Sequence, residues 1–99
     1  MSFADFLSSI EKEATPSPAL APELAALWQD RRGHWENAHA LAQKAGGKDG
    51  SWVHAYLHRK EGDVTNAAYW YRLAGRPVSR AEWADEWQQI ARALLDDND

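Results

Sequence analysis

The sequence predicts an all-α protein with a single domain, and three observations support this. The chain has 99 residues and no cysteine, a length that suits one hydrophobic core and lies well below the ~250 residues at which chains usually divide. Apolar residues recur at helical spacings of three and four. Two segments repeat each other, each with a central glycine. Residues 1–99 are therefore expected to contain, in order, an N-terminal helix (1–13), a linker (14–21), two helical hairpins (22–46 and 51–75) and a capping helix (79–95).

Residues 1–13 predict a short amphipathic helix. Ser2 and Asp5 match the S-x-x-[DE] pattern of an N-terminal cap. The apolar stripe of this helix comprises Phe3, Phe6, Leu7 and Ile10. A helix this short is marginal alone, so its apolar face must dock on the main body or on a second copy of the chain, which would make the protein a homo-oligomer. Three prolines between residues 16 and 22 then predict an extended linker over residues 14–21.

Residues 22–46 and 51–75 predict two helical hairpins. A shift of 29 residues superimposes identical residues at six positions, namely Ala26/Ala55, Gly33/Gly62, Asn37/Asn66, Ala38/Ala67, Ala45/Ala74 and Gly46/Gly75. Gly33 and Gly62 each separate two apolar helical stretches, and glycine suits such a bend because it accepts a positive φ. Residues 46–50 are expected to form the loop between the hairpins.

The turn and second-helix start of each unit resemble tetratricopeptide repeats. The resemblance rests on residues 33–38 (GHWENA), residues 62–67 (GDVTNA) and Ala67-x3-Tyr71, which resembles the A-x3-F step of that motif. It covers about residues 22–77 and implies two stacked tetratricopeptide-like hairpins. The chain departs from the family in its shorter period, in lacking W-x2-L-G-x2-Y, and in placing Ala42 where the first unit would carry an aromatic residue. Residues 52–77 also resemble a group of small uncharacterised bacterial proteins, which implies a fold and no function.

Residues 79–95 predict the last helix, which would cap the second hairpin as the terminal element of a repeat array. Gly75 and Pro77 end the preceding helix, and Ser79 with Glu82 forms a capping pair. The predicted apolar stripe is Trp83, Trp87, Ile90 and Leu94. The carboxylates Glu82, Asp85 and Glu86 are expected on the solvated face, and the end DDND is expected to be frayed.

Charge and composition exclude several function classes. The net charge of −4 divides into −4 over residues 1–30, +5 over residues 31–80 and −5 over residues 81–99. An acidic total argues against a general nucleic-acid-binding protein, and the absence of cysteine excludes a thiol nucleophile and cysteine-based metal sites. No stretch approaches the ~18 apolar residues of a membrane span, and the start lacks a signal-peptide pattern. We therefore expect a cytoplasmic protein that does not bind membranes.

Catalytic signatures do not occur in the sequence. It contains no G-x-S-x-G motif and no glycine-rich phosphate loop that ends in Lys-Ser or Lys-Thr. We therefore expect a protein that is not an enzyme and needs no cofactor.

His54, His58 and Glu61 form the sequence pattern closest to a metal site. Spacings of four and three stack their side chains on one helical face, as a site made of two histidines and a carboxylate requires. A rotation of about 100° per residue puts them opposite the apolar stripe of the same helix, facing solvent or a groove. An ordinary role on the surface is the alternative. His34 is expected at the first turn, and His39 is expected half-buried beside the apolar stripe.

Aromatic and basic residues of the second hairpin predict a partner-binding surface. The three consecutive aromatics of residues 69–71 radiate around their helix, so they are either covered from two sides or partly exposed. Arg72 and Arg76 follow four residues apart, and Arg59 on the preceding helix would extend the surface. Arginines beside exposed aromatics hold anionic or peptide ligands through charge-assisted hydrogen bonds and stacking.

The leading functional hypothesis is a non-enzymatic helical-repeat interaction module that binds a protein or peptide partner of acidic character. Its expected binding residues are Arg59, Tyr69, Arg72 and Arg76. The alternative is a metal- or small-ligand-binding protein that uses His54, His58 and Glu61. A third and weaker hypothesis is binding of single-stranded nucleic acid by aromatics interleaved with arginines.

Overall fold

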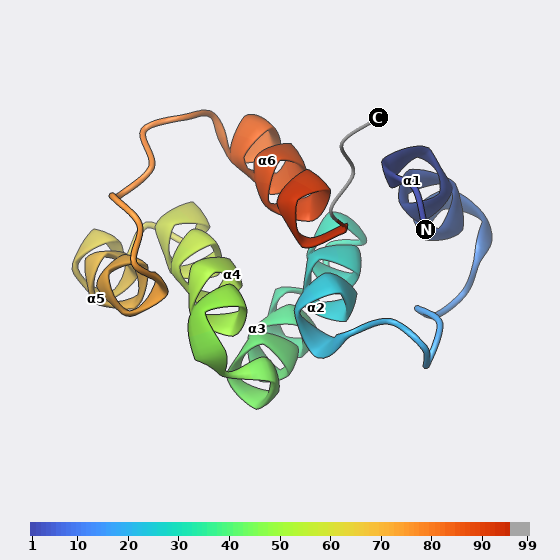
Figure 1. Cartoon of the computed structure of the whole chain (residues 1–99), viewed down its shortest axis with the longest axis horizontal. Coiled ribbons are helices and arrows are strands. Elements are labelled where there is room, and N and C mark those ends of the chain that lie inside the picture. Colours follow the sequence, from blue (N-terminus) through green and yellow to red (C-terminus); the bar gives the residue numbers. More distant parts are fainter. Residues whose placement is uncertain (96–99) are drawn as a thin grey trace.

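The computed structural model describes residues 1–95, and over this range the chain forms six α-helices and no strand (Figure 1). The helices are α1 (Phe3–Lys12), α2 (Pro22–Arg31), α3 (Trp35–Ala45), α4 (Gly47–Lys60), α5 (Val64–Ala74) and α6 (Trp83–Leu95). The predicted all-α class is confirmed. No helix among residues 1–95 combines the length and the apolar character that crossing a membrane requires.

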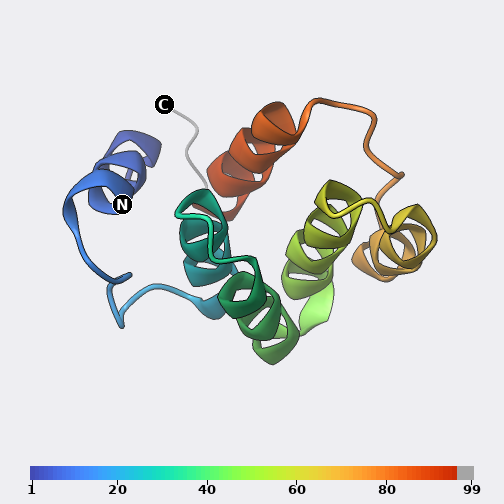
Figure 2. The same cartoon turned by 180° about the vertical axis from the view of Figure 1, so that it is seen from behind.

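Helix α4 is the centre of the molecule. It packs against α5, α3, α6 and α2, and Figures 1 and 2 show α5 on one side of it, α2 and α3 on the other, and α6 across one end of the assembly. Residues 50–58 are consecutively buried as a result. Because neighbours surround α4, it presents no polar face to solvent, a situation typical of a core helix.

The two predicted glycine turns adopt the backbone conformation expected of them. Gly33, between α2 and α3, has φ of 83°, and Gly62, between α4 and α5, has φ of 93°. Both values fall in the left-handed region that residues with a Cβ rarely adopt. Each turn folds its two helices against each other, so that α2 packs on α3 and α4 packs on α5.

The predicted loop over residues 46–50 is wrong. Helix α4 already begins at Gly47, and Gly50 lies inside it. A Cβ atom at Gly50 would stand 3.0 Å from the carbonyl oxygen of Ala42, so this glycine allows α3 and α4 to approach closely. The connection shrinks to Gly46, which has a positive φ, as does Gly47 at the start of α4, and α4 is correspondingly longer than expected.

Helix α1 docks on the main body of its own chain. Its Phe6 ring stacks on Trp87 of α6, with ring centroids 5.9 Å apart. Its Ser9 hydroxyl accepts a hydrogen bond from the Trp28 indole at 3.1 Å, and Arg32 donates to two backbone carbonyls near the end of α1. The apolar face of α1 is therefore used within the chain, which removes the observation on which self-association through this helix rested.

Helix α6 begins at Trp83 and not at residue 79. The Ser79 hydroxyl accepts a hydrogen bond from the Ala81 amide and forms a turn ahead of the helix. As expected, α6 docks on the second hairpin, through α4, but it also packs on α2 and α1, so it is not a terminal cap on that hairpin alone. It therefore does not cover the outer side of α5, and Tyr69 and Leu73 remain 50% and 46% exposed.

The buried face of α6 is rotated from the predicted stripe. Trp87 and Ile90 are buried as expected, and Glu86 and Ala91 are buried with them. Trp83 is 50% exposed. Glu86 was expected in solvent, and this prediction is wrong because its carboxylate points into the molecule, where Arg59 of α4 and Tyr71 of α5 bind it.

Candidate functional site

Three histidines meet where α3 packs on α4. One ring nitrogen from each of His39, His54 and His58 lies within 4.8 Å of the corresponding atoms of the other two, and the ring centroids are 4.5–5.0 Å apart. We call these residues the histidine cluster. His54 and His58 are 2% and 7% exposed, so the prediction that they face solvent or a groove is wrong. Helix α4 has neighbours on this side as well, since His39 of α3 and Trp70 of α5 contact the His54 ring.

Two tryptophans hold the histidine cluster from opposite ends. The His54 ring stacks on Trp70 of α5, with centroids 3.9 Å apart and an interplanar angle of 17°. The His39 ring stacks on Trp35 at 4.9 Å and 12°. Trp35 is itself fixed, because its indole N–H donates to the carbonyl of Leu57 at 3.1 Å. The imidazoles therefore have defined orientations in a largely apolar setting.

The hydrogen bonds of the histidine cluster leave it incompletely satisfied. Nδ1 of His58 lies 2.7 Å from a carboxylate oxygen of Glu61, so Nδ1 carries the proton and donates it. Nε2 of His58 has only a long contact with the Asn66 amide, at 3.4 Å. Nε2 of His39 is buried and has no hydrogen-bond partner among the described residues. A buried nitrogen without a partner is uncommon in a folded protein.

Burial keeps two members of the histidine cluster, His39 and His54, neutral. Burial first, and then the charges of the neighbouring His39 and His58, lower the pKa of His54 to about 4. The pKa of His39 is also lowered, first by burial and then by His58. Desolvation disfavours the charged imidazolium. His39 and His54 are therefore uncharged at neutral pH. In each ring one nitrogen carries the proton and the other keeps its lone pair.

The structure regroups the residues that the sequence assigned to a metal site. Glu61 contacts His58 and gathers with it and Asp63, not with His54. His39, which belongs to another helix, joins His54 and His58 instead. The only sequence signal for this was the expected half-burial of His39 beside the apolar stripe. Spacing within one helix could not show which residue of a neighbouring helix completes a site.

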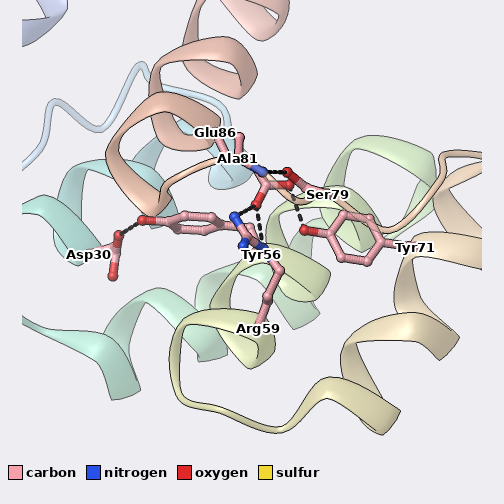
Figure 3. A network of polar contacts seen from close by, with 7 residues as sticks. All are labelled: Asp30, Tyr56, Arg59, Tyr71, Ser79, Ala81 and Glu86. Atoms are coloured by element: carbon pink, nitrogen blue, oxygen red, sulfur yellow. Dashed lines mark hydrogen bonds and ion pairs between the residues drawn. The ribbon is translucent and has the colours of Figure 1, made fainter.

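Arg59 belongs to a buried polar network (Figure 3). Its Nε and Nη2 donate to the same Glu86 oxygen at 3.0 and 2.7 Å, and the Tyr71 hydroxyl donates to the other oxygen. Glu86 is 1% exposed. Burial disfavours the Arg59 cation, but the hydrogen bonds and charge of Glu86 outweigh this and raise the pKa of Arg59. The prediction that Arg59 adds to an outward surface is therefore wrong.

A second buried carboxylate, Asp30, is satisfied in the same way. The Tyr56 hydroxyl donates to one of its oxygens at 2.7 Å, and the Lys60 ammonium donates to the other at 2.9 Å. Burial, followed by the charge of Asp30, raises the pKa of Tyr56. These groups tie α2 to α4. Since the polar atoms of Asp30, Tyr56 and Lys60 are paired with one another, these residues stabilise the fold rather than offer groups to a ligand.

Tyr69 and Arg72 lie on the outer side of α5, and both are exposed. Arg76 does not share their helical face, contrary to the prediction, because α5 ends at Ala74 and Gly75 is left-handed with φ of 71°. The Arg76 guanidinium instead lies 3.4 Å from the ring centroid of Trp52. Four-residue spacing indicates a shared face only while the helix continues.

The exposed arginines of this region have no carboxylate partner within residues 1–95. The ion pairs of that range involve His58, Arg59 and Lys60, but not Arg72, Arg76 or Arg80. Asp96 and Asp97 were the expected internal partners, and they lie outside the described residues. The positive charge of these arginines is therefore uncompensated by the part of the chain that the structure describes.

No protein-family model matches this chain, and searches of curated proteins and of solved structures find no significant match.

Proposed function

We propose that the protein is a non-enzymatic helical module that binds an acidic protein or peptide segment on the outer face of α5. The observation that carries this proposal is the uncovered state of that face. Helix α5 has α4 as its main packing neighbour, and it leaves Tyr69 and Leu73 about half exposed. We call Tyr69, Leu73 and Arg72 the α5 surface.

The chemistry of the α5 surface suits a segment that mixes apolar and acidic residues. Tyr69 and Leu73 stand four apart and offer one apolar strip on the helix. Arg72 lies beside them without a carboxylate partner in residues 1–95. Tyrosine and arginine are the residue types that contribute most to many protein interfaces, since they combine large contact areas with polar groups.

The helix order supports a kinship with tetratricopeptide-like hairpins. Helices α2 and α3 pack as one pair, α4 and α5 pack as a second pair, and the two pairs adjoin through α3 and α4. In such arrays the terminal helix presents a face that another repeat would otherwise cover. A partner segment would occupy that position on α5.

Affinity capture from native lysate tests the proposal. We expect the wild-type protein to retain an acidic partner, and we expect Arg72→Glu and the double variant Tyr69→Ser/Leu73→Ser to lose it. All three proteins should keep nearly the same melting temperature, since exposed side chains contribute little to stability. Lys12→Glu reverses a charge on α1, on the far side of the molecule from α5 (Figure 1), and serves as the matched control.

Salt dependence gives a second measurement on the same capture. Association steered by Arg72 should weaken between low and physiological ionic strength, because exposed charges are then screened. If all variants capture the same proteins as the wild type, the α5 surface is not the binding surface. Loss of capture in Lys12→Glu as well would indicate nonspecific attraction to charge.

A further inference from the structure

We infer that the histidine cluster binds one divalent transition-metal ion of the zinc class through His39, His54 and His58. The site lies between α3 and α4 and shares no residue with the α5 surface, so the inference does not rest on the proposed partner surface. Three convergent imidazoles are a donor set that zinc, cobalt(II) and nickel(II) favour, whereas calcium and magnesium prefer oxygen ligands.

The geometry of the histidine cluster is close to that of a metal site. A tetrahedral ion with ligand nitrogens at 2.0–2.1 Å sets those nitrogens roughly 3.3 Å apart. The three candidate atoms here lie at most 4.8 Å apart, so ring rotations that move each nitrogen by about an ångström would close the site. Nε2 of His39 is buried and has no hydrogen-bond partner among the described residues, so a metal ion bound to it would supply one.

The protonation state of the cluster favours a cation. Metal ions bind the neutral imidazole, and protons compete with them for the same lone pairs. Burial keeps His39 and His54 neutral at physiological pH. A metal ion would therefore displace no proton from these two rings.

Glu61 acts as a positioning residue for His58. Its carboxylate lies 2.7 Å from Nδ1 of His58, the arrangement in which a carboxylate fixes the tautomer of a ligand histidine and leaves the other nitrogen for the metal. That nitrogen, Nε2, is engaged only by the long contact with Asn66. The sequence pattern predicted Glu61 as a metal ligand, but in the structure it contacts a ligand histidine, His58.

An aromatic core role is the competing explanation for the same cluster. His54 and His39 stack on tryptophans, and such packing requires no ion. The two explanations predict different metal affinities and different NMR shifts of the ring nitrogens when zinc is added, so both are measured.

Calorimetric titration of the untagged chain with zinc chloride tests the inference directly. We expect one ion per chain with micromolar or tighter affinity, and a melting temperature that rises with zinc concentration. His39→Gln and His58→Gln should weaken binding by at least about tenfold, and Glu61→Gln by about tenfold. His34→Gln should bind as the wild type does, because His34 is exposed at the start of α3 and outside the cluster.

Imidazole NMR of the wild type supplies a readout that requires no variant. Adding zinc should shift one ring nitrogen in each of His39, His54 and His58 and leave His34 unchanged, and cobalt(II) should give the visible absorption of a tetrahedral site. The absence of zinc binding to a folded wild-type chain would overturn the inference and favour the aromatic core. Binding that His39→Gln leaves intact, or that shifts His34, would also overturn it.

Discussion

Asp30 and Glu86 show how single side chains connect the helices of this protein. Each is a buried carboxylate that meets one cation and one tyrosine hydroxyl. Burying an ion costs several kcal/mol unless its partners compensate it closely, and removal of one partner leaves the other charge unpaired. Asp30 lies on α2 and Glu86 on α6, so both outer helices are held to α4 by charges that tolerate little displacement.

The histidine cluster predicts a loss of stability on mild acidification. Burial holds the pKa of His54 near 4, below its ordinary value of 6.5, so between these values the unfolded chain binds more protons than the folded chain. Stability is then fully present above about pH 6.5 and is lost as the pH falls toward 4, at about 1.4 kcal/mol per pH unit for each such proton. Urea unfolding between pH 7 and pH 5, with a chelator present, measures this slope.

Two variants identify the group responsible. His54→Gln should reduce the slope by about one proton, whereas His34→Gln, which alters an exposed histidine, should leave it unchanged. An unchanged slope in His54→Gln would show that other groups cause the acid sensitivity.

Side-chain directions on α4 were the part of the molecule that sequence patterns predicted least well. A stripe argument assumes that a helix has one buried and one solvated face. Helix α4 has neighbours all around it, so His54, His58 and Arg59 became internal despite their polarity. These side chains are covered by α3, α5 and α6, and no local pattern in residues 47–60 contains that information.

At the scale of elements, helix type and the two helical pairs were predictable, and the full placement of α6 was not. Amphipathic spacing located all of the helices in the described chain, because that spacing is a local property. The start of α6 was set four residues too early, since Ser79 can cap a helix or form a turn and the sequence does not distinguish these uses. The contact of α6 with α4 was expected, but its contacts with α2 and α1 were not, because they join segments far apart in the sequence.

Two tryptophans of α6 provide an internal comparison of burial. Trp87 is 1% exposed, contacts Phe6, and donates its indole N–H to the carbonyl of Leu27 at 3.0 Å. Trp87→Ala should therefore lower the free energy of unfolding by about 3–5 kcal/mol. Trp83 lies four residues earlier and is 50% exposed, so Trp83→Ala should change it by less than about 0.5 kcal/mol.

Chemical denaturation of both variants, followed by circular dichroism, gives the comparison. Similar losses in the two variants would mean that the rotated face assigned to α6 is not the face that packs.

At the scale of the whole molecule, the acidic segments that flank the basic middle of the sequence fold back and close onto it. The basic middle of the sequence supplies Arg59 and Lys60, and the acidic flanking segments supply Glu86 and Asp30, their partners. Some of the opposite charges of these segments therefore pair inside the molecule. The exposed arginines Arg72, Arg76 and Arg80 have no carboxylate partner within residues 1–95. The N-terminal helix completes this closure, because α1 packs on α6 and its Phe3 and Phe6 rings meet Trp87.

Deletion of residues 1–13 tests whether this closure stabilises the whole molecule. It removes Phe3, Phe6 and Ile10, which are buried, and each such side chain contributes roughly 1.5–3 kcal/mol. The summed loss approaches the lower end of the ~5–15 kcal/mol typical of a whole domain. We expect a helical protein with a much lower melting temperature that self-associates as its concentration rises, since Trp87 becomes exposed.

A synthetic peptide of residues 1–13 should restore the melting temperature and the monomeric state, as measured by thermal unfolding and analytical ultracentrifugation. A truncated chain as stable and as monomeric as the full chain would mean that α1 is an appendage and not part of the core.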